Sequence, residues 1–128
     1  MKKIVWEKFL GVNSVAGVCC LLRQPLGLVR SDPVTRVLLR SCLVETWEVG
    51  NAMRVGLEES AIKAVLDWAD SLPPDAKPSM LRDLENGNQL ELDIFRGAVI
   101  RLGEKLGVST PVNKLIHAAL TLYADGKP

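Results

Sequence analysis

The sequence predicts an all-α fold, a bundle of about five to seven helices that forms a single domain over residues 1–128. Three observations support this prediction. Apolar residues recur at helical spacing along most of the chain, no stretch alternates convincingly as a strand does, and helix-start and helix-stop signals separate the apolar segments. A chain of 128 residues buries roughly two thirds of its unfolded surface, which is enough for an independent core.

The first helix is expected over about residues 4–22. Two glycines, Gly11 and Gly17, interrupt it, and each costs roughly 1 kcal/mol relative to alanine. A helix usually keeps such glycines because another group packs close to its backbone. The apolar positions of this helix are Val5, Phe9, Val12, Val15 and Cys19.

A connection with Pro25 and Gly27 comes next, and the following helix begins at Asp32-Pro33. Asp32 is an expected N-cap acceptor, and Pro33 takes the first helical position, where its missing N–H is harmless. The helix is expected to stop near Gly56. Its broad apolar face suits either the spine of a bundle or a contact between subunits.

In the second half of the chain, the sequence predicts four shorter helices. One starts near residues 58–60 and stops before Pro73-Pro74, and one is capped by Ser79 and ends at Asn86-Gly87. Glu91 opens the third helix, which ends at Gly107, and Thr110-Pro111 begins the last. The expected buried positions of these last two helices are Phe95, Ala98, Val99 and Leu102, then Val112, Leu115, Ile116, Ala119 and Leu120.

The composition excludes several classes of function. Apolar residues make up 48%, charged residues 24%, and the net charge is +1, so nothing favours a nucleic-acid partner. We expect no membrane span, because no apolar run approaches the ~20 residues required. The odd number of cysteines (Cys19, Cys20 and Cys42) and their spacing predict free thiols, no metal site and a cytoplasmic protein.

Three polar residues are candidates for chemistry. Lys8 shares one face of the first helix with Val12 and Ala16. Ser79 and Glu91 stand at two predicted helix starts, where backbone N–H groups attract anions. A lysine, a serine and a glutamate are suitable types for reducing a ketone, since the reaction needs a proton donor and anchors for the substrate.

The same residues carry a resemblance to a known family. The segment from Val5 to Leu10, the Ser79-to-Glu91 spacing and the run Gly-Val-x-Thr-Pro-x-Asn from Gly107 resemble the C-terminal domain of ketopantoate reductases (2-dehydropantoate 2-reductases). The resemblance implies a helical fold similar to the C-terminal domain of 6-phosphogluconate dehydrogenase. It also implies that Lys8 is the general acid on the keto oxygen and that Ser79 and Glu91 bind the substrate.

The sequence departs from the family pattern at three positions. Well-studied members carry asparagines where Val12 and Ala16 stand, and often another where Arg96 stands. Asn13 lies about 100° around the helix from Val12. A pocket without those amides would bind ketopantoate less well, which leaves open a different 2-oxo acid or lost activity.

Cofactor and partners follow from the resemblance. Family enzymes use NADPH, held by an N-terminal Rossmann domain, but this sequence contains no Gly-x-Gly, so we expect the chain alone to bind no NADPH and to be inactive by itself. The first hypothesis is therefore the substrate-binding and dimerising part of an NADPH-dependent 2-oxo-acid reductase of pantothenate biosynthesis or a related pathway, with a homodimer as the expected assembly. The alternative is a non-catalytic, truncated helical module that acts in self-association or protein interaction.

Overall fold

The computed structural model describes residues 2–92 and 96–127, and within these ranges the fold is all-α with no strand, as predicted. Phe95, an expected core residue, lies outside the described residues. The helices are α1 (Lys2–Leu22), α2 (Leu26–Ser31), α3 (Pro33–Ala52), α4 (Ser60–Ser71), α5 (Ser79–Glu85), α6 (Ala98–Leu106) and α7 (Pro111–Thr121).

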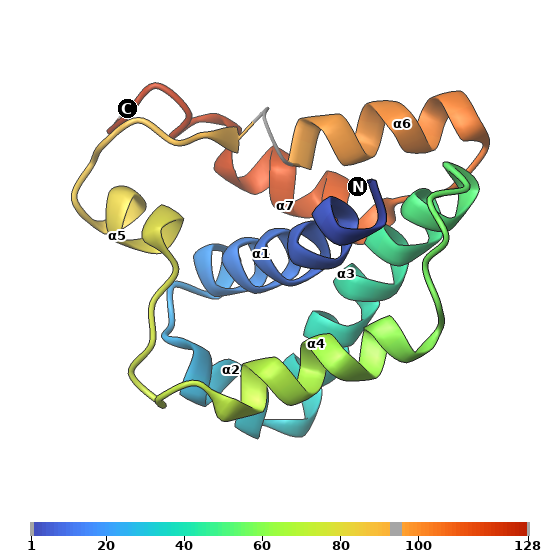
Figure 1. Ribbon diagram of the computed structural model, residues 1–128. Coiled ribbons are helices and arrows are strands. Elements are labelled where there is room, and N and C mark those ends of the chain that lie inside the picture. Colours follow the sequence, from blue (N-terminus) through green and yellow to red (C-terminus); the bar gives the residue numbers. More distant parts are fainter. Residues whose placement is uncertain (1, 93–95, 128) are drawn as a thin grey trace.

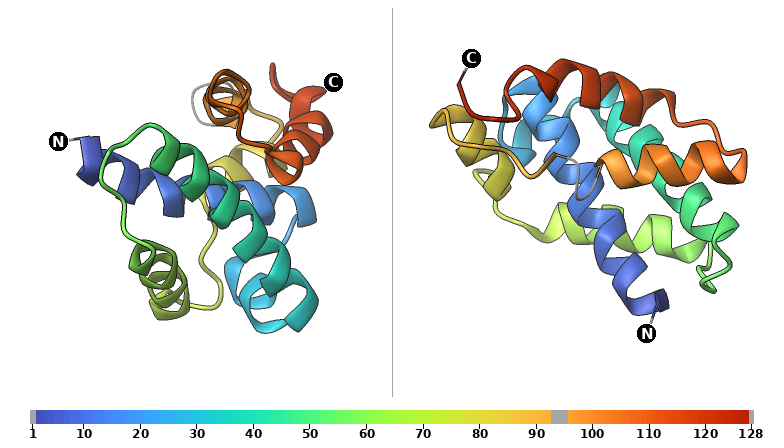
Figure 2. Two further views of the ribbon diagram at one scale, coloured as in Figure 1. Left: turned by 90° about the vertical axis from the view of Figure 1, so that its right-hand side faces the viewer. Right: turned by 90° about the horizontal axis from the view of Figure 1, so that it is seen from above.

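Helix α1 runs through the middle of the molecule. It packs beside α3, with α6 and α7 on one side of this pair and α4 on the other (Figure 1). The two turned views show the same layering, and α2 joins the layer of α4 (Figure 2). Because α1 contacts α2, α3, α4, α5 and α7, its different faces can present side chains to different layers.

The core consists of two groups of buried apolar side chains. The larger group joins α1 to α2, α3, α5 and α7, and the smaller group joins α1 and α3 to α4 around Leu10, Leu43 and Val65. Burying a leucine or valine side chain contributes about 1.5–3 kcal/mol. Fully buried members of the larger group include Val18, Leu26, Leu39, Leu81 and Ile116.

The expectation that no segment is long and apolar enough to cross a membrane was wrong for α1. Residues Lys2–Leu22 meet that requirement by length and composition. However, 56% of the most apolar window of this helix is buried inside the fold, as in the core helix of a globular domain. This burial explains why α1 is apolar. The apolar composition of α1 is therefore only weak evidence for a membrane segment.

Local signals set several helix ends as predicted. The Asp32 carboxylate accepts hydrogen bonds from the backbone N–H groups of Val34 (2.8 Å) and Thr35 (3.2 Å) at the start of α3. Gly107 ends α6 in the left-handed conformation, with φ of 75°. Helix α3 ends at Ala52, earlier than the expected stop at Gly56.

Ser79 and Thr110 were expected to cap α5 and α7, but neither side chain makes a capping hydrogen bond. Pro78 occupies the N-cap position of α5, Ser79 is its first helical residue, and no side chain caps that end. Thr110 does precede Pro111 at the start of α7, but its side chain makes no capping bond. The expected core stripe of α7 was also partly wrong, because Leu115 is 58% exposed whereas Ile116 and Leu120 are buried.

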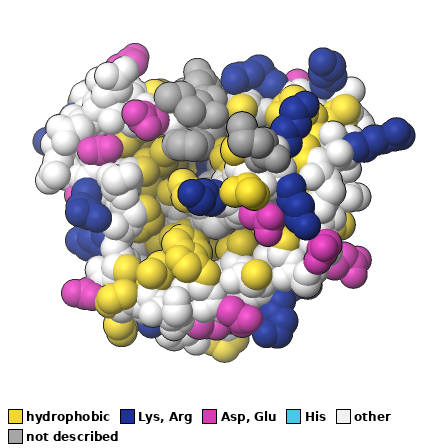
Figure 3. Space-filling model, viewed as in Figure 1, with side chains coloured by type: hydrophobic (Ala, Val, Ile, Leu, Met, Phe, Trp, Pro, Cys, Tyr) yellow, Lys and Arg dark blue, Asp and Glu magenta, His cyan; other side chains and the backbone are white. Residues whose placement is uncertain are grey.

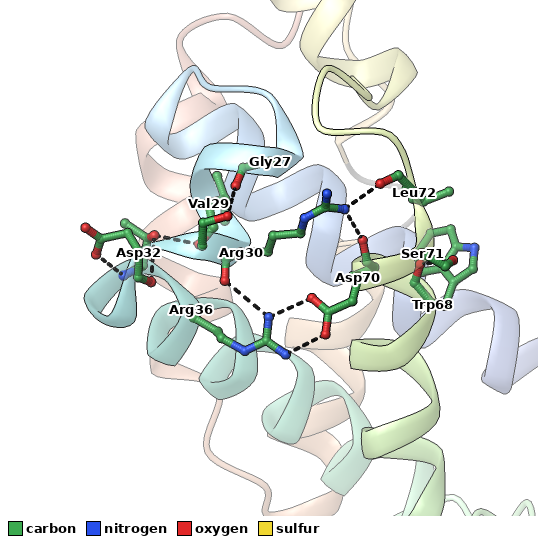
Figure 4. A network of polar contacts seen from close by, with 12 residues as sticks. Gly27, Val29, Arg30, Asp32, Arg36, Trp68, Asp70, Ser71 and Leu72 are labelled. Carbon is green, nitrogen blue, oxygen red and sulfur yellow. Dashed lines mark hydrogen bonds and ion pairs between the residues drawn. The ribbon is translucent and has the colours of Figure 1, made fainter.

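An arginine-rich junction fixes the ends of α2 and α4 against α3 (Figure 4). Arg36 on α3 donates two hydrogen bonds to the Asp70 carboxylate, at 2.9 and 3.0 Å, and one to the carbonyl oxygen of Arg30. Arg30 donates to the carbonyl oxygens of Ala69 and Leu72, both at 2.6 Å, at the C-terminal end of α4. The Arg36 guanidinium holds the pKa of Asp70 below its usual value. This junction fixes one end of α4 relative to α2 and α3.

Candidate functional site

A groove between α1 and α4 is the candidate site. It consists of two adjoining depressions of about 410 Å³ and about 250 Å³, which share Val12 and Trp68 in their linings. The space-filling view shows apolar side chains gathered in the hollow between α1 and α4 and continuing towards α5 (Figure 3). The larger depression lies within the range of ~300–1,000 Å³ that is typical of small-molecule sites.

The wall of this groove depends on a glycine in α1. A Cβ atom added at Gly11 would lie 3.0 Å from Cζ3 of Trp68, so the missing side chain lets the indole ring rest against the helix. Trp68 remains 42% exposed, and its ring faces the groove that it helps to line. The prediction that a group packs close to the glycines of α1 is therefore confirmed at Gly11.

Lys8 lines the larger depression, together with Glu7 at the same end of the groove. The side chain is exposed and, within the described part of the chain, forms no ion pair or hydrogen bond. One helical turn further along lie Gly11 and Val12, which continue the lining of the groove. The ammonium group is thus available to an anionic or carbonyl ligand placed over Val12.

Ser79 lines the smaller depression, at its α5 side. It is exposed and stands in the first turn of α5, beside Lys77 and Pro78. Lys77 is bound to the carboxylate of Glu85, at 3.1 and 3.2 Å. Lys8 and Ser79, which are far apart in the sequence, therefore face two parts of one groove, and apolar side chains separate them.

Glu91 lines a different depression, of about 650 Å³, next to α7. Its described neighbours there include Asp83, His117 and Asp125. The described residues therefore bring together two of the three predicted site residues, Lys8 and Ser79, and leave Glu91 apart.

A buried polar network on another face of α1 was not predicted. Arg96, which is 2% exposed, donates hydrogen bonds to the carbonyl oxygen of Asn13 (2.5 Å) and to Oδ1 of Asn113 (2.6 Å). Asn13 in turn donates through Nδ2 to Asn113 Oδ1 and to Thr46 Oγ1, both at 3.1 Å. A Cβ atom at Gly17 would overlap the Arg96 guanidinium, which explains the second glycine of α1. The network locks the orientation of α1, and hence of Lys8, against α3 and α7.

Glu45 from α3 completes this network by capping α7. Its carboxylate accepts hydrogen bonds from the backbone N–H groups of Val112 (2.8 Å) and Asn113 (3.0 Å) and from Asn113 Nδ2 (2.9 Å). A carboxylate at a helix N-terminus is favoured by the exposed N–H groups and the helix dipole. The Asn113 amide therefore connects the buried cation Arg96 to the buried anion Glu45.

The described residues give little evidence of a site for a cofactor or a metal ion. Among residues 2–92 and 96–127 no group of three or more His, Cys, Asp or Glu side chains could hold a metal ion. The same residues include no strand, and a dinucleotide pyrophosphate is usually held at a glycine-rich turn between a strand and a helix. The described residues therefore do not fit NADPH by that arrangement.

The three cysteines are free and buried. Burial raises the pKa of Cys19 and of Cys20 to about 12, and it also raises the pKa of Cys42. Thiols with such pKa values are protonated at neutral pH and make poor nucleophiles. None of them faces the groove between α1 and α4.

Comparison with known proteins identifies relatives over almost the whole chain. The family model described as "Ketopantoate reductase PanE/ApbA C terminal" matches residues 1–124. A 2-dehydropantoate 2-reductase of Pyrobaculum aerophilum is 31% identical over 94% of this chain and 44% of that protein. An uncharacterized oxidoreductase of Bacillus subtilis is 29% identical over 99% of this chain and 42% of that protein.

The fold comparison agrees with the sequence comparison. A dimeric ketopantoate reductase from Staphylococcus aureus superposes with a TM-score of 0.89 at 22% identity, over 95% of this chain and 43% of that chain. The chain thus spans less than half the length of the relatives it matches. The matching family model is that of the C-terminal part of these enzymes, as the sequence resemblance predicted.

Proposed function

Because the chain belongs to the ketopantoate reductase PanE/ApbA C-terminal family, we propose that it forms the substrate-binding part of a 2-oxo-acid reductase. The observation that carries this proposal is the groove with Lys8 at one end and Ser79 at the other. The curated relatives named 2-dehydropantoate 2-reductase support the same reaction class.

In this function the groove residues bind and protonate the substrate. The Lys8 ammonium attracts the anionic 2-oxo acid, donates a hydrogen bond to its keto oxygen and supplies a proton as that oxygen becomes a hydroxyl. Ser79 offers its hydroxyl and the exposed N–H groups of the first turn of α5 to the polar end of the substrate. Reduction also needs a hydride, which a nicotinamide supplies from outside the described residues.

Glu91 keeps its predicted role as a substrate contact in this proposal. It stands immediately before the helical residue Leu92, on a segment that continues into the α6 region. It lines a different depression from Lys8. The role of Glu91 is therefore tested separately from that of Lys8.

A chimeric enzyme tests the proposal. This chain replaces the matching part of the Pyrobaculum aerophilum relative, and NADPH oxidation is followed with a series of 2-oxo acids. Lys8→Ala is expected to lower kcat by ~10²–10⁴-fold, the usual contribution of a general acid. Lys63→Ala, at an exposed site on α4, is the matched control and should leave kcat unchanged. Equal turnover of the Lys8→Ala variant and the parent would remove Lys8 from the reaction.

Self-association is the second candidate function, and a distinct surface supports it. Leu28 on α2 and Val34 and Val37 on α3 are 61%, 78% and 65% exposed, so these two neighbouring helices present apolar side chains to solvent. The occupant that we propose is a second copy of the chain. Light scattering after gel filtration should show a dimer that Val37→Lys converts to a monomer, whereas a monomeric parent at high concentration would rule this function out.

A further inference from the structure

We infer that the groove between Lys8 and Ser79 selects a 2-oxo acid with a large apolar side chain, either aromatic or branched aliphatic. The inference rests on the proposed function, because it names the substrate class of the same site. It is carried by the chemistry of the groove lining.

Polar side chains stand at the two ends of the groove, and apolar side chains fill the space between them. Glu7 and Lys8 mark one end, and Lys77 and Ser79 mark the other. Between the two ends, the described lining side chains are all apolar. They include Val12, Val15, Ala16, Val65, Trp68 and Leu72.

The middle of the groove offers exposed apolar surface to a ligand. Val12 and Trp68, the two residues that both depressions share, are 45% and 42% exposed. A ligand whose carboxylate and keto groups lie at Lys8 would place its side chain over these two residues. Covering them with a phenyl or branched alkyl group removes apolar area on both partners from water, which favours binding.

The same lining disfavours a hydroxylated substrate such as ketopantoate. Its hydroxyl group would lie over the side chains of Val12 and Trp68, where it covers less apolar surface than a phenyl or branched alkyl group would. Each methylene group's worth of apolar surface left uncovered weakens binding by roughly 4-fold.

Calorimetric titration of the chain of residues 1–128 tests this inference with two probes, phenylpyruvate and ketopantoate. We expect phenylpyruvate to bind at least ~10-fold more tightly, because its phenyl group covers more of the apolar surface of the groove. Val12→Asn places an amide in the groove and should reduce or reverse this preference. Leu115→Asn places an amide at an exposed site on α7, outside the groove, and should leave the preference unchanged.

Lys8→Ala separates the inference from the proposed function. If the inference and the proposed function are both right, Lys8→Ala weakens the binding of phenylpyruvate and of ketopantoate. The parent chain then prefers phenylpyruvate. If ketopantoate binds as tightly as phenylpyruvate and Lys8→Ala weakens both, the inference fails and the proposed function stands. If neither acid binds, or if Lys8→Ala changes nothing, the proposed function and the inference both fail.

Discussion

The two glycines of α1 give a sharp test of the packing, because the same substitution should act differently at each. Gly17→Ala puts a methyl group where the Arg96 guanidinium lies. Arg96 would lose its hydrogen bonds to the Asn13 carbonyl oxygen and to Asn113 Oδ1 in a fully buried site. Hydrogen bonds that involve a charged group contribute about 1.5–3 kcal/mol each.

The helix itself gains from the same change. Alanine is favoured over glycine in a helix interior by about 1 kcal/mol. Subtracting this gain from the loss of the two charged hydrogen bonds leaves a net destabilisation of about 2–5 kcal/mol for Gly17→Ala. At Gly11 the added methyl meets only Trp68, at 3.0 Å, and that ring is 42% exposed and can move outwards. Gly11→Ala should therefore change the free energy of unfolding by no more than about 1 kcal/mol.

Urea denaturation followed by far-ultraviolet circular dichroism measures both changes. The double variant Gly17→Ala with Arg96→Met identifies the cause, because the two sites should be coupled by about 0.5–3 kcal/mol if the methyl acts through the guanidinium. A Gly17→Ala chain as stable as the parent would refute the reasoning. Additive effects of the two substitutions would refute it as well.

Three further predictions concern the buried polar network around Glu45, the thiols of Cys19 and Cys20, and the ion pair between Arg36 and Asp70. Glu45→Gln should destabilise the chain by about 1–3 kcal/mol and speed hydrogen exchange at the first amides of α7, whereas Glu48→Gln at an exposed site should change neither. Cys19 and Cys20 should not react with a disulfide reagent in the native chain at pH 8 and should react at once in denaturant, because burial raises their pKa to about 12; rapid native labelling would contradict this. Asp70 has a lowered pKa in the folded chain, so its pairing stabilises the fold above the ordinary value of 3.8 and loses that effect as the pH falls through the folded value. The unfolding free energies of the parent and Asp70→Asn should then differ by up to about 1 kcal/mol near neutral pH and converge in acid, and a constant difference would exclude the pairing.

Local chemistry explains why much of the fold could be predicted from the sequence. Asp32 and Gly107 act within one turn of their own helix ends, so their neighbours in sequence are enough to define them. Helical spacing was only a partial guide to the buried faces, since Val15 and Cys19 of α1 are buried whereas Val5 and Val12 are exposed. The failure at Ser79 is instructive, because Pro78 already supplies the extended residue that begins α5.

The polar network could not be predicted with the same rules. Glu45 and Asn113 are 68 residues apart, and Arg96 and Asn13 are 83 apart, so no local pattern joins them. Arginine and glutamate usually lie at the surface, since burying a charged side chain is costly unless a partner is present. Two signals did exist. Gly17 indicated a close neighbour of α1, and Glu45 falls among Cys42, Thr46 and Val49 on the buried face of α3.

The candidate site was predictable only in part. Lys8 was singled out by the helix face that it shares with Val12 and Ala16, Ser79 by its place at a helix start, and both by a family resemblance. Both residues line the groove between α1 and α4. The apolar wall was not foreseen, because Trp68 belongs to α4 and meets α1 only through the missing side chain of Gly11. The position of Glu91 depends on a segment next to residues outside the described ranges, which no pattern of spacing could fix.

A two-dimensional amide NMR titration with phenylpyruvate tests the central claim most directly, because it reports where a 2-oxo acid binds. The expected shifts fall on the backbone amides of Lys8, Val12 and Ser79 and on the side-chain N–H of Trp68, and Lys8→Ala should abolish them. Shifts confined to the depression around Glu91, or no shifts at millimolar ligand, would contradict the assignment of the groove as the substrate site.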